Sequence, residues 1–155
     1  RIRIPTPQPA TPDSVAATVR QLVSEHDYSG PVGCCFPTIV VDGAAKSASN
    51  MGEEWRDLAV DKTFSEATGL PFTVFNDADA AGMAEMRLGA GVELDGLVIT
   101  ITVGTGIGSA LFYRGQLIPN LELGHMAGKG GIPIEKWTSD RVRKEEGLSV
   151  ASLLY

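Results

Sequence analysis

Hydrophobic residues recur along the chain at two spacings, one typical of helices and the other of strands. Apolar positions three or four residues apart predict helices over residues 12–26, 56–68, 77–89 and 134–146. Alternating or continuous apolar runs predict strands over residues 1–4, 31–37, 71–75 and 96–103, and another within residues 104–118. This alternation of helices and strands predicts an α/β layer structure with a largely parallel sheet plus a hairpin.

Turn and capping residues stand at the ends of these elements. Thr11 followed by Pro12 is a typical helix start, and Gly69 followed by Pro71 is a typical helix end. Asp42-Gly43 predicts a hairpin turn within residues 39–50, and Arg114-Gly115 predicts a second turn. The boundaries of the elements are therefore supported by residues other than the apolar ones.

Composition narrows the class of protein. The 155 residues, 43% hydrophobic and 21% charged, suit one globular domain or a large part of one. The apolar runs are too short to cross a bilayer and no apolar leader is visible, so we expect a soluble cytoplasmic protein that binds no membrane. Thirteen basic against nineteen acidic residues give a net charge of −6, which argues against nucleic-acid binding. Cys34 and Cys35 are adjacent, without the spacing of a metal cage, and are expected to be buried thiols in a strand.

The first candidate for chemistry is Asn76-Asp77, where a predicted strand passes directly into an alanine-rich helix. Polar residues at the carboxyl edge of a sheet are where open α/β folds bind ligands. Asn and Asp are also the preferred residues at helix starts, and on local evidence Asn76, Asp77 or Asp79 could cap this helix. The small residues of the helix predict close packing against the sheet.

The second candidate is the stretch TVGTGIGSALF. Its glycines, Gly104, Gly106 and Gly108, leave backbone amides free to surround an anion, and the Thr105 hydroxyl adds a donor. It matches neither the dinucleotide fingerprint nor the P-loop with its lysine. Phosphate binding and a plain glycine-rich hairpin turn remain equal alternatives for this stretch.

The third candidate is the stretch NLELGHMAGKGG. Glu122 and His125 are three residues apart, so in a helix or turn they share a side and can hold two neighbouring hydroxyls. As an isolated pair they are better explained as a solvated surface acid and a loop histidine.

In this order, the three stretches resemble the ROK family of sugar kinases, and most closely its polyphosphate glucokinase branch. The resemblance covers nearly the whole chain. The stretches RIRIPTPQPATPDSVA, SASNMGEEW and KWTSDRVRKEEGLS are similar to that branch specifically. The resemblance implies an actin-like, ribonuclease-H-like α/β fold, incomplete at both ends, with residues 1–75 ending the N-terminal lobe and residues 76–155 beginning the C-terminal lobe.

The resemblance also implies a reaction, the transfer of a terminal phosphoryl group from polyphosphate, with ATP as an alternative donor, to the 6-hydroxyl of glucose. Asp77 would be the general base, and Asp79 would be left as the helix cap. The sugar would be bound by Asn50, Asn76, Glu122, His125 and Glu135. The transferred phosphates would be held by Gly104, Thr105, Gly106 and Gly108, with Mg²⁺ neutralising their charge.

Two departures from the family pattern matter. Many members carry a C-x-C-G-x-x-G-C zinc cluster after the histidine, and no cysteine follows His125, so no zinc is expected. The family's first phosphate motif and its closing Gly-Gly segment are not found between Arg1 and Tyr155. The chain thus resembles the middle of a kinase and is expected to show little activity alone; dimers are usual in the family.

A basic cluster stands out in this acidic protein. By resemblance, Lys136, Arg141, Arg143 and Lys144 would bind polyphosphate. An ordinary solvated helix face paired with neighbouring glutamates explains the cluster equally well. Two other functions remain open, a sugar-binding module without catalysis and a strictly ATP-dependent glucokinase.

Overall fold

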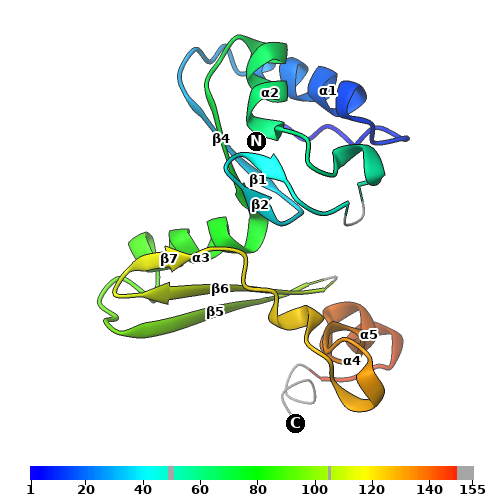
Figure 1. The fold of residues 1–155 in the computed structure, drawn as a ribbon, viewed down its shortest axis with the longest axis vertical. Coiled ribbons are helices and arrows are strands. Elements are labelled where there is room, and N and C mark those ends of the chain that lie inside the picture. Colours follow the sequence, from blue (N-terminus) through cyan, green and yellow to red (C-terminus); the bar gives the residue numbers. More distant parts are fainter. Residues whose placement is uncertain (49–50, 105, 150–155) are drawn as a thin grey trace. The chain divides into compact units, whose positions relative to one another are not determined.

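The computed structural model describes residues 1–48, 51–104 and 106–149. It divides into two compact units, Arg1–Asp77 and Ala78–Tyr155, and each is described by itself. The first unit holds two helices and a pair of parallel strands (Figure 1). The second holds a three-stranded antiparallel sheet, one long helix and a group of short helices.

In the first unit, α1 (Pro12–Glu25) and α2 (Val60–Thr68) pack side by side (Figure 1). The Thr11 hydroxyl accepts a hydrogen bond from the Ser14 N–H at the start of α1, and Gly69 ends α2 in the left-handed conformation. Both ends were predicted from these residues. The observed helix is shorter than the one predicted over residues 56–68. Asp57 has a positive φ of 59°, and α2 begins only at Val60.

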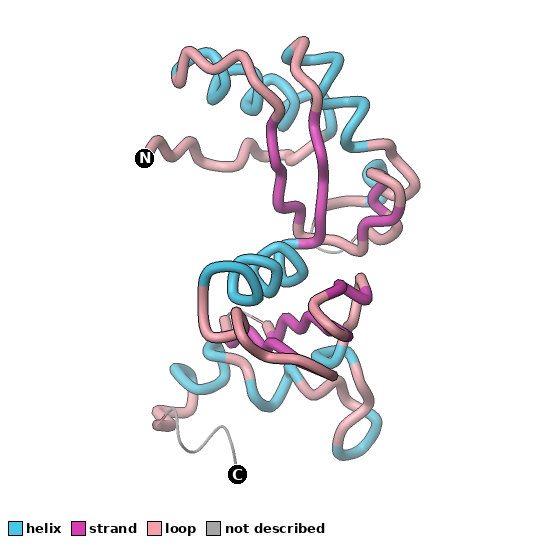
Figure 2. Tube along the Cα trace, turned by 90° about the vertical axis from the view of Figure 1, so that its left-hand side faces the viewer, coloured by secondary structure: helices cyan, strands magenta, loops and turns pink. Residues whose placement is uncertain are grey.

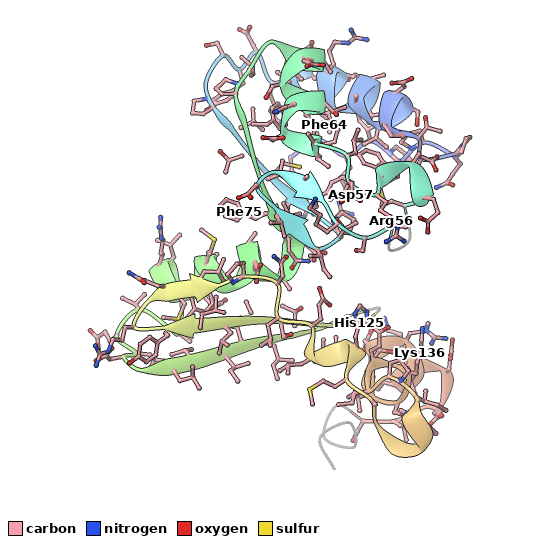
Figure 3. The ribbon with its side chains drawn as sticks, in the orientation of Figure 1. Arg56, Asp57, Phe64, Phe75, His125 and Lys136 are labelled. Carbon is pink, nitrogen blue, oxygen red and sulfur yellow. The ribbon has the colours of Figure 1, made fainter. Side chains whose placement is uncertain are left out.

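The strands β1 (Val32–Phe36) and β4 (Phe72–Asn76) run parallel, with Phe36 opposite Asn76 at their carboxyl ends. Aromatic residues of this unit form the centre of its core. The ring of Trp55 is fully buried 4.9 Å from that of Phe36, and its indole N–H donates to the Ala10 carbonyl at 2.7 Å. Phe64, labelled in Figure 3, lies on the side of α2 that faces this core.

The hairpin of the first unit is formed by β2 (Val40–Val41) and β3 (Ala44–Ala45). Asp42 and Gly43 make its turn with φ values of 49° and 76°, as their sequence predicted. A short 3₁₀ helix, η1 (Glu53–Trp55), follows. The strand predicted over residues 1–4 is wrong, because this segment is extended without pairing to another strand, as Figure 2 shows.

The sheet of the second unit is formed by β5 (Leu97–Val103), β6 (Ile107–Tyr113) and β7 (Gln116–Ile118). One face of this sheet packs against α3 (Asp77–Leu88). Contact is close, since a Cβ added to Gly82 would lie 2.8 Å from the Cβ of Ala110 and 2.9 Å from Phe112 Cε2. The predicted close packing of the alanine-rich helix is therefore confirmed.

The opposite face of this sheet is also apolar. Alternate residues of β5 remain 48–66% exposed there, namely Leu97, Ile99, Ile101 and Val103. The register places Leu111 and Tyr113 of β6 opposite two of them. Both faces of this antiparallel sheet therefore carry apolar side chains, and in the described residues α3 packs on one of them.

The carboxyl-terminal part of the second unit consists of short helices. They are the 3₁₀ helices η2 (Leu123–His125) and η3 (Lys129–Gly131) and the α-helices α4 (Glu135–Thr138) and α5 (Asp140–Glu145). The single helix predicted over residues 134–146 is wrong. Ser139 has extended backbone angles between α4 and α5, and its hydroxyl caps α5 by accepting from the Val142 N–H.

The predicted largely parallel sheet also needs correction. In the described residues the parallel pair is β1–β4, while β2–β3 and β5–β6–β7 are antiparallel. Apolar runs such as residues 96–103 identify strands but contain no information about the direction of their neighbours. No helix in the described residues has the length and apolar character needed to cross a membrane.

Candidate sugar and phosphate site

Asn76 and Asp77 lie where β4 passes directly into α3, as the sequence predicted. Asn76 is buried, and its side-chain Nδ2 donates a hydrogen bond to the Thr38 carbonyl at 3.0 Å. This bond fixes the orientation of the Asn76 amide at the carboxyl edge of the parallel strands. Asp77 is the first residue of α3 and its side chain is exposed.

Asp79 does not cap α3, so that prediction is wrong. It is the third residue of the helix, and it is only 2% exposed. Its Oδ2 accepts a hydrogen bond from the backbone N–H of Asn120 at 2.9 Å. The carboxylate therefore connects α3 to the segment just before Glu122.

The ELGH segment, residues 122–125, is held to β6 by two structural residues. The buried hydroxyl of Ser109 donates to the Leu121 carbonyl at 2.7 Å and accepts from the Leu123 N–H at 3.0 Å. Gly124 is buried against Ile107, where an added Cβ would collide with the Ile107 carbonyl oxygen. The backbone on both sides of Glu122 is thus fixed, and a side chain at position 124 is excluded.

Glu122 and His125 share a side of this turn, as their spacing predicted. His125 Nδ1 lies 3.3 Å from Glu122 Oε2, and His125 Nε2 lies 3.9 Å from Glu135 Oε1. The imidazole is exposed, while the two carboxylates are partly buried. Figure 3 labels His125, which belongs to η2, and Lys136, which belongs to α4. The fold thus brings three predicted sugar ligands together.

Gly104 and Gly106, which we call the glycine turn, lie between the end of β5 at Val103 and the start of β6 at Ile107. Gly104 N–H donates to the Gly106 carbonyl at 2.9 Å, and Val103 pairs with Ile107 across the turn. Gly106 lies under Glu135, since a Cβ added there would be 2.6 Å from Glu135 Oε2. The predicted sugar ligands therefore meet the predicted phosphate loop within one unit.

A further predicted residue, Gly108, has a different position. Gly108 lies in β6, where an added Cβ would be 2.9 Å from that of Ala78, so packing against α3 already explains this glycine. Thr105 and Asn50 lie outside the described residues.

Each of the four predicted polyphosphate-binding cations has an acidic neighbour. Lys136 lies 3.8 Å from Glu135, and Arg141 lies 3.2 Å from Glu145. Arg143 and Lys144 both pair with Asp140, at 2.6 and 2.7 Å. Hydrogen bonds from Lys144 and Arg143 lower the pKa of the Asp140 carboxyl below its ordinary value.

Four residues that shape this region were not predicted from the sequence to position the proposed ligands. They are Asp79, Ser109, Gly124 and Asp140. Gly124 had a signal, because a glycine between two candidate ligands indicates a close backbone approach. Asp140 had a local signal toward Arg143 and Lys144, three and four residues further on, but none toward Gly104, 36 residues earlier. Ser109 lacked one, since its partner Leu121 is 12 residues away.

The carboxylates of this region fit a Mg²⁺ ion that is bound mainly through phosphates. No group of three or more His, Cys, Asp or Glu side chains that could hold a metal occurs in the described ranges. Mg²⁺ commonly binds with one or two carboxylates, several waters and substrate phosphates, so such a group is not required. Glu135, whose Oε2 lies beside Gly106 in the same unit, is a carboxylate that could take part.

Comparison with known proteins gives the same family as the motifs. The ROK family profile matches residues 1–135. A relative from Mycobacterium tuberculosis, named polyphosphate glucokinase, is 43% identical over 146 residues, which are 94% of this chain and 55% of the relative. The chain therefore spans about half the length of this curated relative.

Comparison with solved structures supports the same family assignment. The inorganic polyphosphate/ATP-glucomannokinase from an Arthrobacter strain matches with a TM-score of 0.90 and 44% identity, covering 99% of this chain and 64% of that one. A ROK family glucokinase from Streptomyces griseus, solved with glucose and AMPPNP, matches with a TM-score of 0.69 and 29% identity. The match covers 90% of this chain and 48% of that one. These matches define the class of the fold as actin-like. Within that class, the chain belongs to the ROK family, which confirms the resemblance.

Proposed function

We propose that this chain carries the sugar site and one phosphate loop of a polyphosphate-dependent glucokinase. The observation that carries the proposal is the meeting of Glu122, His125 and Glu135 with Gly106 of the glycine turn. A sugar kinase must hold hydroxyl groups and phosphate groups next to each other, and this unit brings residues suited to both together.

The sugar is held by hydrogen bonds to its hydroxyl groups. Glu122 and Glu135 accept hydrogen bonds from hydroxyls, and His125 can donate or accept at either ring nitrogen according to its tautomer. Carboxylate acceptors make stronger bonds than neutral ones, which suits a polar ligand that must leave water. The resemblance to the family adds Asn50 and Asn76 as further proposed sugar ligands.

Asp77 acts as the general base. The sugar 6-oxygen attacks the terminal phosphorus, its proton moves to the Asp77 carboxylate, and the bond from phosphorus to the leaving phosphate oxygen breaks. The products are glucose 6-phosphate and a donor shorter by one phosphoryl group. Asp77 is exposed at the first turn of α3, so its carboxylate is accessible to a substrate, which supports this role.

The glycine turn binds the transferred phosphates, and the Gly104 N–H exchanges its hydrogen bond to the Gly106 carbonyl for one to a phosphate oxygen. When bound, Mg²⁺ supplies positive charge to the donor phosphates. That charge matters here because the Glu135 carboxylate lies beside Gly106 and would otherwise repel an anion. Lys136, which neighbours Glu135, offsets part of the same negative charge.

Polyphosphate is the favoured donor, with ATP as a second one. This proposal rests on the similarity to the Mycobacterium tuberculosis polyphosphate glucokinase and the Arthrobacter polyphosphate/ATP-glucomannokinase, and on the cations of α4 and α5. Each cation already has an acidic neighbour, so a donor must compete for them. A polyanion with many phosphates competes better than a single phosphate.

Glucose 6-phosphate formation tests the proposal. We would compare this chain with a version joined to the segments that the Arthrobacter glucomannokinase has beyond the matched region, using polyphosphate or ATP as donor. We expect little turnover from the 155-residue chain and activity with both donors from the joined protein. Asp77→Asn in the joined protein should lower kcat by at least about 100-fold, because general-base catalysis contributes about 10²–10⁴-fold.

The same variant separates a kinase from a sugar-binding module without catalysis. Asp77→Asn should bind glucose nearly as well as the parent protein, measured by calorimetry, while turnover is lost. Normal turnover in this variant would refute the role of Asp77. Glucose binding without any phosphoryl transfer by the joined parent would favour the non-catalytic module.

A further inference from the structure

Asp140 connects the glycine turn to two of the cations proposed to bind polyphosphate. Its backbone N–H donates to the Gly104 carbonyl at 2.8 Å. Its carboxylate accepts from Arg143 Nε through Oδ1 at 2.6 Å and pairs with Lys144 Nζ through Oδ2 at 2.7 Å. One residue therefore contacts both the phosphate loop and the cationic helix.

Neighbouring residues fix Asp140 in this place. Ser139 is 1% exposed, and its hydroxyl caps α5 through the Val142 N–H. Val142 itself is buried, which holds the inner side of α5. The backbone bond to Gly104 does not involve the side chain, so a change of side chain at position 140 need not disturb the loop.

The Asp140 carboxylate occupies the groups that a phosphate would use. Carboxylate and phosphate oxygens both make short charge-assisted hydrogen bonds to Arg and Lys. Arg143 and Asp140 are both about one quarter exposed, so solvent screens their pair less than it screens the more exposed pair of Arg141 with Glu145. The lowered pKa of Asp140 means that its carboxyl stays charged at neutral pH.

We propose that Asp140 is a specificity-determining residue for the phosphoryl donor, because its carboxylate competes with a bound polyphosphate for Arg143 and Lys144. The inference rests on the proposed function in assigning these cations to the donor. The inference adds that a residue of the protein itself competes with the donor for these cations. Asp140 lies where a polyphosphate that extends from the glycine turn reaches α5. Affinity for long polyanions is thereby reduced, and the glucose ligands are unaffected.

Binding of fluorescent polyphosphate to the 155-residue chain, followed by anisotropy over a range of NaCl concentrations, tests the inference. Asp140→Asn should lower Kd several-fold at low salt. The slope of log affinity against log salt should steepen by up to about 1.4, because each of two freed cations contributes roughly 0.7 on a flexible polyanion. Glucose affinity should not change.

Two further variants make the test specific. Asp140→Glu keeps the charge and should bind polyphosphate about as weakly as the parent chain. Glu145→Gln removes an acid from the same helix, but its pair with Arg141 is more exposed and more screened by solvent than the pair of Asp140 with Arg143, so its effect should be smaller. If Asp140→Asn and Glu145→Gln had equal effects, the change in net charge alone would explain the tighter binding, and the inference would be overturned. An unchanged Kd in Asp140→Asn, or no polyphosphate binding by any variant, would also overturn it.

The two proposals can fail separately. The anisotropy experiment needs no turnover, while the proposed function is judged by glucose 6-phosphate from the joined protein. Activity with polyphosphate together with an unchanged Kd in Asp140→Asn would reject the role of Asp140 alone. Tighter binding by Asp140→Asn without any phosphoryl transfer would reject the kinase assignment and leave a polyanion site controlled by Asp140.

Discussion

The carboxylate of Asp79 in α3 accepts a hydrogen bond from the backbone N–H of Asn120, 41 residues further along the chain. Asn120 has a positive φ of 63° and lies two residues before Glu122. The buried acid of α3 therefore helps to place the segment that carries a proposed sugar ligand. Its role is to position that segment, whereas the family resemblance left it as the helix cap.

Replacing this acid should destabilise the protein. Asp79→Ala leaves the Asn120 N–H without this acceptor, at a cost of about 1–3 kcal/mol for a buried polar group. Urea unfolding of the variant measures the loss, and glucose affinity should fall because Asn120 is close in sequence to Glu122. Asp77→Ala, on the exposed first residue of the same helix, is the matched control and should change the free energy of unfolding much less. Equal losses in the two variants would contradict the positioning role.

Gly124 should not tolerate a side chain. A Cβ there would collide with the Ile107 carbonyl oxygen, which belongs to the backbone of β6 and cannot move aside cheaply. Gly124→Ala should therefore shift the ELGH segment, cost about 1–3 kcal/mol of stability, as overpacking usually does, and weaken glucose binding. Calorimetric titration with glucose, together with urea unfolding, measures both effects.

Gly33 provides the control for this substitution. It lies in β1, with nothing within 4 Å of an added Cβ. Gly33→Ala should leave glucose affinity unchanged and stability nearly so. If Gly124→Ala bound glucose as well as Gly33→Ala, close packing against Ile107 would not explain the glycine.

The helices and turns with local signals could be predicted from the sequence, and those shaped by distant contacts could not. Thr11, Gly69 and the Asp42-Gly43 turn act on their own neighbours, and each behaves as predicted. The break between α4 and α5 depends on Ser139, whose capping role competes with a continuous helix. Apolar periodicity continued across it and favoured the wrong answer.

The candidate site divides in the same way. The spacing of Glu122 and His125 fixed their shared side, because both lie in one turn. The approach of Glu135 to His125 and Gly106 depends on how the polypeptide between residues 126 and 134 folds back, for which local patterns contain no rule. Cys35 shows the same limit, since it was expected to be buried and is exposed on β1.

Gly82 should resist the substitution that helix propensity favours. Alanine is better than glycine inside a helix by about 1 kcal/mol. At this position, however, the new Cβ would lie 2.7–2.9 Å from Thr100, Ala110 and Phe112 of the sheet. Overpacking costs about 1–3 kcal/mol, so Gly82→Ala should lower the free energy of unfolding on balance.

The reverse change on the exposed side of the same helix is the control. Ala84 is exposed, so Ala84→Gly should cost about 1 kcal/mol from propensity alone. Urea unfolding of both variants compares the two effects. A stabilised Gly82→Ala variant would show that the helix and sheet can separate slightly at little cost.

The two adjacent cysteines should differ in reactivity. Burial, and to a lesser extent the neighbouring Cys35, raises the pKa of the Cys34 thiol from 9.0 to about 11. The thiolate is the reactive form, and at pH 8 only about one Cys34 in a thousand would carry it. Cys35 is exposed, so a thiol reagent should modify it first and leave Cys34 intact in the folded protein. Mass spectrometry after brief alkylation at pH 8 identifies the modified residue.

The raised pKa of Cys34 also predicts how stability depends on pH. Folding favours the protonated thiol. The contribution of Cys34 to the free energy of unfolding is therefore complete below pH 9.0 and is lost as the pH rises toward about 11. Cys34→Ala should therefore lose less stability than the parent chain between pH 8 and pH 11, measured by urea unfolding at each pH. Cys35→Ala retains Cys34 and should still lose stability over that range. If the parent chain and Cys34→Ala showed the same pH dependence, the Cys34 thiol would not be the group responsible.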